Sequence, residues 1–158
     1  MESFIQLLQR CCCSKTDTLF RKALPRLGFK VTKNGRRRYA FRPGATKTSP
    51  LLVCHADTVV NAGNGKHNWA IDGSLVNSIA LDDRLGLALM IWAIAHCPDD
   101  IGQCAMLVCD DEETGNSTAQ EFVEDIQPNW LMEFDRRGKD VVTYEYESEL
   151  WNGILSSV

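Results

Sequence analysis

The stretch that decides the fold is Leu51–Asp57, which reads LLVCHAD. Its four leading apolar residues form a short run of the kind that is typical of a strand buried on both faces of a sheet. His55 and Asp57 follow directly where that strand would end. Two further apolar runs, Cys104–Cys109 and Trp130–Phe134, have the same character. The sequence therefore predicts three buried strands in this part of the chain.

Helical segments separate these strands. Leu85–His96 is almost continuously apolar and contains no proline, so we expect a buried helix there. Ser117–Asp125 is predicted to be a second helix, with Phe122 and Val123 facing inward. Alternation of strands and helices indicates an α/β fold, a three-layer αβα sandwich whose mixed sheet is mainly parallel.

The flanking segments complete the predicted domain. Ser3–Leu27 has the apolar spacing of helices, and two strands, Phe29–Lys33 and Arg38–Phe41, surround a hairpin signal at Asn34-Gly35. Val141–Tyr146 is predicted to be a fourth strand after the three buried ones. We expect residues 1–158 to form one compact domain, with helices in 1–28, an α/β core in 29–146, and no lid or dimerisation domain.

Composition excludes several classes of protein. The chain has 158 residues, a net charge of −4 and 44% hydrophobic residues, which is ordinary for a globular protein and argues against a nucleic-acid partner. Apolar stretches such as Leu87–Ala95 are too short to span a membrane, and the N-terminus lacks the basic region of a signal peptide. The seven cysteines are odd in number and three are adjacent, which predicts free thiols in a reducing, cytoplasmic setting.

Acidic residues and a histidine follow each predicted strand or begin the long helix. They are His55, Asp57, Asp82, Asp83, Asp110, Asp111, Glu112, Glu113 and Asp135. Because ligand sites of open α/β sheets lie at the carboxyl ends of the strands, we expect these side chains to meet at one edge. Carboxylates gathered so closely need compensating cations. Nitrogen and oxygen ligands together favour zinc, with manganese or cobalt as alternatives, in a two-metal hydrolytic site.

Local spacing suggests distinct tasks for neighbouring residues. His55 and Asp57 are two positions apart and share one face of an extended chain, so Asp57 can orient the imidazole for metal binding. Glu112 and Glu113 are adjacent, so their side chains point in different directions. One of the two can hold metal while the other acts as a general base.

In this order, four motifs resemble the co-catalytic zinc exopeptidases, a superfamily that includes peptidase T, the carboxypeptidase G type enzymes and the tetrahedral aminopeptidases. They are His55-x-Asp57, Ala80–Gly86 (ALDDRLG), Asp111–Gly115 (DEETG) and Asp135.

The resemblance implies a role for each position. His55 and Asp135 would be zinc ligands, and Asp57 would orient His55. Asp82 would bridge two zinc ions and could be joined to Asp83 by a cis peptide. Glu112 would be the general base, and Glu113 would bind the second zinc. The substrate would be a peptide or an N-acylated amino acid.

The chain departs from the family pattern in its last ligand. Family members carry a further histidine near the C-terminus, but no histidine follows Asp135, and the chain is shorter than the family's usual catalytic domain. His67 is a candidate substitute ligand or substrate contact, whereas His96 ends an apolar helix and is interpreted as structural or solvent-facing. The missing ligand could also come from a second copy in a homo-oligomer.

Three functions remain open on the sequence. The first is a zinc-dependent exopeptidase or amidohydrolase, and the second is a single-metal or non-catalytic relative that acts as a binding or regulatory module. The third is an unrelated magnesium-dependent phosphatase. His67, Trp69 and Arg84 are candidates for substrate binding. The arginines at 36–38 are either a solvated hairpin tip or a site for a substrate carboxylate.

Overall fold

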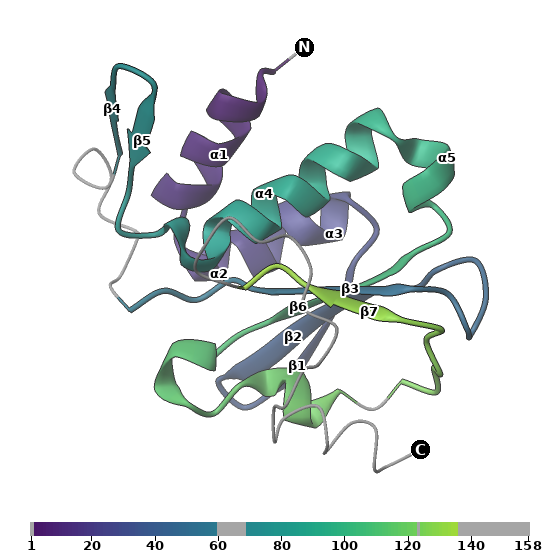
Figure 1. The fold of residues 1–158 in the computed structure, drawn as a ribbon. Helices are drawn as coiled ribbons and strands as arrows, with labels where there is room; N and C mark the ends of the chain where they lie inside the picture. The colour runs from purple at the N-terminus through teal and green to yellow at the C-terminus, as the bar shows by residue number, and fades with distance from the viewer. Residues whose placement is uncertain (1, 60–68, 123, 136–158) are drawn as a thin grey trace.

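The computed structural model describes residues 2–59, 69–122 and 124–135. These residues form a five-stranded sheet in the order β1-β2-β6-β3-β7 and a separate two-stranded hairpin, β4-β5 (Figure 1). The strands are β1 (Lys30–Asn34), β2 (Arg37–Arg42), β3 (Leu51–His55), β4 (Ala70–Asp72), β5 (Leu75–Asn77), β6 (Ala105–Cys109) and β7 (Leu131–Glu133).

The large sheet is mixed, as the sequence predicts. β3 runs parallel to both β6 and β7, whereas β1–β2 and β2–β6 are antiparallel pairs. The β1–β2 turn places Gly35 at φ 64°, a left-handed conformation that the Asn34-Gly35 pair favours. Because β3, β6 and β7 are parallel neighbours, their carboxyl ends lie at the same edge of the sheet. The predicted α/β class is therefore confirmed.

Helices cover one face of this sheet (Figure 1). They are α1 (Phe4–Cys13), α2 (Thr16–Thr18), the π-helical turn η1 (Leu19–Ala23), α3 (Leu24–Arg26), α4 (Leu81–His96) and α5 (Pro98–Ile101). Alternate residues of β3, Leu52 and Cys54, point into a core that also contains Phe20 and Leu87 from the helices. This alternation follows from the two-residue repeat of a strand, which turns successive side chains to opposite faces.

The opposite face carries a second apolar cluster, and here the predicted helix over Ser117–Asp125 is wrong. The structure has 3-10 turns at η3 (Glu112–Thr114) and η4 (Thr118–Glu121), after which Phe122 is extended. Phe122 and Ile126 pack on the second cluster. Two bonds fix Thr118 to the end of β6, since its N–H donates to the Asp110 carbonyl at 2.9 Å and its hydroxyl accepts the Asp110 N–H at 2.8 Å.

Long-range backbone bonds anchor the chain that follows the predicted helix. The N–H of Gln127 donates to the Lys47 carbonyl at 2.9 Å, and that of Asn129 donates to the Thr48 carbonyl at 3.1 Å. Within the predicted helix itself, the bonds of Thr118 to Asp110 tie the chain to the end of β6. Tertiary contacts therefore override the local preference of this segment.

Other predictions have mixed outcomes. All seven cysteines are free, as the sequence predicts. In the part of the chain that the structure describes, no helix is long and apolar enough to cross a membrane. The predicted strand Val141–Tyr146 lies outside the described residues.

Candidate metal centre

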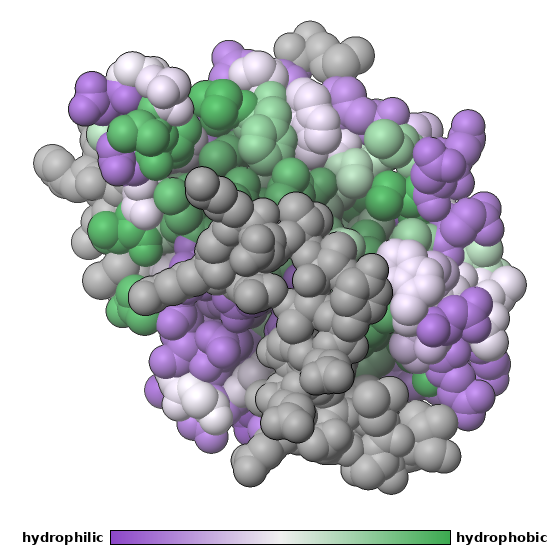
Figure 2. Space-filling model, in the orientation of Figure 1, coloured by the Kyte–Doolittle hydropathy of each residue, from purple (hydrophilic) through white to green (hydrophobic). Residues whose placement is uncertain are grey.

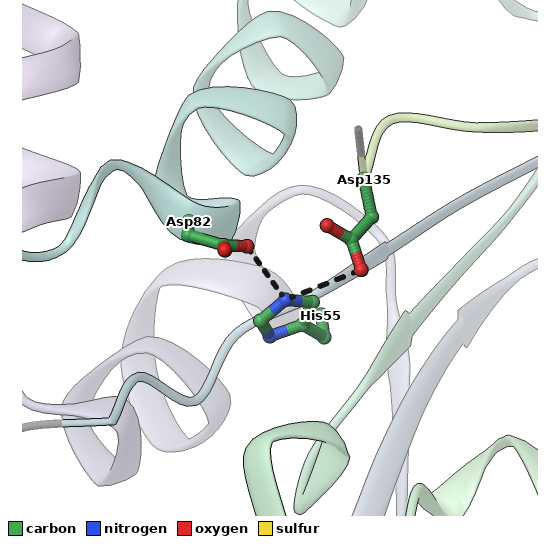
Figure 3. A group of neighbouring side chains, drawn as sticks. All are labelled: His55, Asp82 and Asp135. Carbon is green, nitrogen blue, oxygen red and sulfur yellow. Dashed lines mark hydrogen bonds and ion pairs between the residues drawn. The ribbon is translucent and has the colours of Figure 1, made fainter. Parts of the chain in front are cut away.

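Three side chains converge at the carboxyl edge of the parallel strands (Figure 3). His55 is the last residue of β3, Asp82 stands in the first turn of α4, and Asp135 lies just after β7. Nε2 of His55 is 3.3 Å from Oδ1 of Asp82 and 3.7 Å from Oδ2 of Asp135. One ligand atom from each residue lies within 4.8 Å of the other two, so a single ion could contact all three.

The imidazole of His55 is held from its other side by Asp57. Oδ1 of Asp57 is 3.3 Å from Nδ1 of His55, and its Oδ2 accepts the backbone N–H of Glu113 at 3.0 Å. Burial by itself would lower the pKa of His55, but the hydrogen bond and charge of Asp57, together with Asp83 and Asp135, raise this pKa to about 9. A cation is therefore favoured at this position, either as the imidazolium or as a bound metal ion.

Glu112 also faces the cluster. Oε2 of Glu112 lies 3.8 Å from Nε2 of His55, and 41% of its side chain is exposed. Asp111 precedes it with a left-handed backbone, φ 60°, which turns the chain sharply into η3 after β6. Glu112 thus stands at the rim of the site, within reach of both the cluster and solvent.

The pKa values of several carboxyl groups in and around the cluster are raised. Burial raises the pKa of Asp135 to about 6, where the charge of His55 opposes the shift and those of Asp82 and Glu112 add to it. Burial likewise raises the pKa of Asp83 to about 8 and shifts that of Glu112 upward. These carboxyl groups resist ionisation chiefly because they are partly or wholly removed from water, and the positive charge of His55 only partly offsets this effect.

The donor set fits one divalent ion of the zinc type. An imidazole nitrogen and two carboxylate oxygens are ligands that zinc accepts, with manganese and cobalt as close substitutes. Asp57 supplies the carboxylate–histidine contact that orients a metal-binding imidazole. Glu113 is the residue expected to bind a second ion. Among the described residues, it contacts the site through its backbone N–H, which donates to Oδ2 of Asp57. The role of Glu113 as a second-site ligand stays a prediction.

The cis peptide suggested by the resemblance is present. The bond between Asp82 and Asp83 is cis, and both residues have non-helical dihedral angles within α4. Asp82 is turned toward His55, whereas Asp83 is buried, with 3% of its surface exposed. The sequence also allows Asp82 and Asp83 to cap the first turn of this helix, and Asp83 does so, since its Oδ1 accepts the N–H of Gly86 at 3.0 Å; sequence reasoning assigned no role to Gly86. The available signal was the three-residue spacing of Asp83 and Gly86, which is that of a helix N-cap and its N3 residue.

Two of the substrate-contact candidates, Arg84 and Trp69, have contacts within the protein. Arg84 is fully buried and donates to the Cys11 carbonyl at 3.1 Å and to the Thr16 hydroxyl at 2.9 Å, so it is a structural residue. Trp69 is half-buried and packs against the helix-side core. His67 lies outside the described residues. His96 stacks on Trp92 at the end of α4, which agrees with its structural interpretation.

Two of the three consecutive arginines form ion pairs with other residues of the chain. Arg37 pairs with Glu121 at 2.9 Å, and Arg38 pairs with Asp110 at 2.7 Å and Asp17 at 2.8 Å. Arg36 is exposed at the turn. This arrangement ties the hairpin to η4 and to the N-terminal helices and gives no support to capture of a substrate carboxylate.

The chain resembles known proteins in its fold and not in its sequence. No protein-family model and no curated protein sequence matches the chain. Among solved structures, a tripeptidase from Staphylococcus aureus is similar with a TM-score of 0.65 and 16% identity, over 85% of this chain and 43% of that one. The aminopeptidase PepT from Bacillus cereus is similar with a TM-score of 0.60 and 21% identity, over 86% and 42%.

A third similar structure is an aminoacylhistidine dipeptidase from Vibrio alginolyticus, with a TM-score of 0.58 and 18% identity, over 86% of this chain and 33% of that one. The chain thus spans less than half the length of each of these three peptidases. The match nevertheless includes most of this chain. The described chain therefore shares its fold with these three peptidases.

Proposed function

We propose that this chain is a metal-dependent exopeptidase or amidohydrolase, which cleaves a peptide or an N-acylated amino acid. The observation that carries the proposal is the convergence of His55, Asp82 and Asp135 to within 4.8 Å at the carboxyl edge of the sheet. This convergence occurs in a fold shared with peptidases. The three residues would hold zinc, with manganese or cobalt as alternatives.

The residues around the proposed metal site would have different roles in the reaction. A bound zinc ion supplies Lewis-acid polarisation of the scissile carbonyl and of the attacking water. With Nδ1 protonated, His55 would donate to Asp57, and its Nε2 lone pair would be free to bind a metal ion. Glu112 accepts a proton from the attacking water and passes it to the departing amine nitrogen. Its partly exposed position at the rim gives both molecules access to the carboxylate.

The resemblance also implies a second ion, bridged to the first by Asp82 and bound by Glu113. We expect two zinc ions per chain, with His67 or a residue from a second copy completing the set. One ion per chain would instead support the alternative, a single-metal relative that acts as a binding or regulatory module. The described residues contain one group of three possible metal ligands, which favours this single-metal alternative.

The test measures metal content and hydrolysis together. The protein is purified without chelator, reloaded with zinc and analysed by mass spectrometry, and is then assayed on aminoacyl anilides, tripeptides and N-acylated amino acids. Bound zinc with turnover of one of these substrates supports the proposal. Zinc-free protein, or turnover of phenyl phosphate instead, contradicts it.

A pair of histidine variants sharpens this test. His55→Ala removes a proposed ligand and should lose metal. His96→Ala is the matched control, because His96 lies at the exposed end of α4, where it stacks on Trp92. Equal metal content in both variants would show that the bound zinc is held elsewhere.

Compartment and assembly belong to the same proposal. Free cysteines in a chain of this kind suit a reducing compartment, so we infer a cytoplasmic protein. Homo-oligomer formation is expected if a second copy supplies the last ligand. Gel filtration that gives a strict monomer with two bound zinc ions would exclude that source.

A further inference from the structure

The first helical turn of α4 is capped by a buried carboxyl group. Asp82 and Asp83 have non-helical dihedral angles, and Oδ1 of Asp83 accepts the N–H of Gly86 at 3.0 Å. A bond from residue i to the N–H of residue i+3 is the N-cap arrangement, so the regular part of α4 begins after Asp83. Asp82, which contacts His55, is the residue immediately before this cap.

Phe134, which follows β7, also lies close to Gly86. A Cβ atom placed on Gly86 would lie 2.6 Å from Oδ2 of Asp83 and 2.6 Å from Cβ of Phe134, and closer still to Oδ1 of Asp83. Side chains do not tolerate such distances, so α4, the carboxyl of Asp83 and the end of β7 meet where only glycine fits. We call this contact the Asp83–Gly86–Phe134 junction.

All three candidate ligands are attached closely to this junction. Asp82 precedes Asp83, and Asp135 follows Phe134. The N–H of Phe134 donates to the Val53 carbonyl at 3.1 Å, which ties the junction to β3 two residues before His55. The segments that carry the ligands therefore cannot move apart without disturbing one of these contacts.

A helix cap alone does not account for this carboxyl group. Serine caps a helix as well as aspartate does, and without a buried carboxyl group. Asp83 is 3% exposed, and its carboxyl group interacts with the backbone N–H groups of Gly86 and His55, although no hydrogen bond of normal length reaches its Oδ2. Burying a carboxyl group with so few partners is costly, so the length and planar shape of the side chain, which fill the space beside Gly86, are needed in addition to the cap.

We propose that Asp83 is a positioning residue, and that the Asp83–Gly86–Phe134 junction fixes the spacing of His55, Asp82 and Asp135. This inference rests on the proposed function, because spacing matters only if the three residues bind one ion. The shape and hydrogen bond of Asp83 are what the junction needs, since its oxygens fill the space beside Gly86.

Cobalt binding tests the inference by spectroscopy as well as by affinity. Asp83→Ala and Gly86→Ala should bind Co²⁺ about 10–100-fold more weakly than wild type, with altered visible absorption, as changes around metal ligands do. Asp83→Asn keeps the size and a side-chain oxygen for the Gly86 N–H, so it should restore the wild-type spectrum. Wild-type affinity and spectrum in folded Asp83→Ala would overturn the proposal.

Ser3→Ala is the matched control for loss of a helix cap. The hydroxyl of Ser3 accepts the N–H of Gln6 at 3.3 Å and caps α1 instead of α4. This variant should lower thermal stability and leave the cobalt spectrum unchanged. If it weakens cobalt binding as strongly as Asp83→Ala, the effect is general destabilisation and the positioning role is wrong.

Crystal structures of the metal-free proteins separate this inference from the proposed function. In Asp83→Ala, Asp82 and Asp135 should lie farther from Nε2 of His55 than in wild type, whether or not the wild type binds cobalt. Wild-type protein that binds no cobalt would refute the metal site, while these distances still decide the positioning role. If Asp83→Ala does not fold, Asp83→Ser keeps a cap hydroxyl and takes its place in both experiments.

Discussion

Asp57 holds the side of the His55 imidazole that faces away from Asp82. Its Oδ1 lies 3.3 Å from Nδ1 of His55, while Nε2 on the other side of the ring faces Asp82 at 3.3 Å. The two ring nitrogens therefore have separate tasks, one fixing the orientation of the ring and one facing the carboxylates. Loss of Asp57 should therefore weaken metal binding although Asp57 is not itself a proposed ligand.

Asp57→Ala is expected to weaken zinc binding by about 10–100-fold, because the imidazole loses its orienting partner. It also removes the acceptor for the Glu113 N–H. Competition with a chromophoric chelator measures the affinity, and Asp99→Ala, at an exposed position of α5, is the control. Unchanged affinity in Asp57→Ala would show that the ring is held by its packing alone.

Glu112→Gln should leave metal content nearly intact and reduce kcat by about 10²–10⁴-fold, the usual contribution of a general base. The amide keeps the size of the side chain but cannot accept a proton from water. Metal analysis and steady-state kinetics on the substrate found in the screen provide the two measurements. Turnover above a few per cent of wild type would assign the base to another residue.

Arg84→Ala should lower the free energy of unfolding by about 3–5 kcal/mol, because it removes a buried side chain and the donor to the Cys11 carbonyl. Cobalt affinity of the folded variant should stay near wild type, since the described contacts of Arg84 lie in the N-terminal helices. Urea denaturation measures the change, with the exposed Arg26→Ala as control. Normal stability with a raised KM would restore Arg84 as a substrate contact.

Asp17 gives the protein a dependence of stability on pH. Hydrogen bonds from Arg38 and Arg21 lower the pKa of Asp17 from its ordinary value of 3.8. A lowered pKa in the folded state stabilises the protein above pH 3.8, and this contribution is lost as the pH falls through the folded-state pKa.

Asp17→Asn should therefore unfold more easily than wild type near pH 7, and the difference should shrink as the pH falls below about 4. Thermal melts over this range provide the measurement. Asp99→Asn, on α5, should melt like wild type throughout. A difference between Asp17→Asn and wild type that is constant with pH would show that the ion pair with Arg38 is not its cause.

Much of the site can be predicted from the sequence because its residues sit at fixed offsets from strong local signals. The apolar run before His55 marks a strand end, and parallel neighbours must place their ends at one edge. The structure indeed brings His55, Asp82 and Asp135 together, and the cis bond between Asp82 and Asp83 is present. The direction of the Glu113 side chain cannot be predicted in this way, because it depends on how the turn after β6 closes.

The segment after Thr118 shows the limit of local reasoning. Its residues are predicted to be helical, yet bonds from Gln127 to Lys47 and from Asn129 to Thr48 attach the following chain to a distant loop. Such bonds join positions about eighty residues apart, so no window of sequence contains both partners. Arg84 shows the same limit, since its partner Cys11 is 73 positions away.

The sequence by itself determined the five strands of the large sheet, the hairpin at Asn34-Gly35 and the chemical types at the sheet edge, because each depends on residues close together in the chain. Only the tertiary structure decided which acidic side chains meet His55 and which are buried. Asp82 and Asp83 are adjacent and chemically identical, but one turns toward the imidazole and the other caps α4 against Gly86 and Phe134. That division follows from the packing of α4 against β3 and β7, which no local pattern encodes.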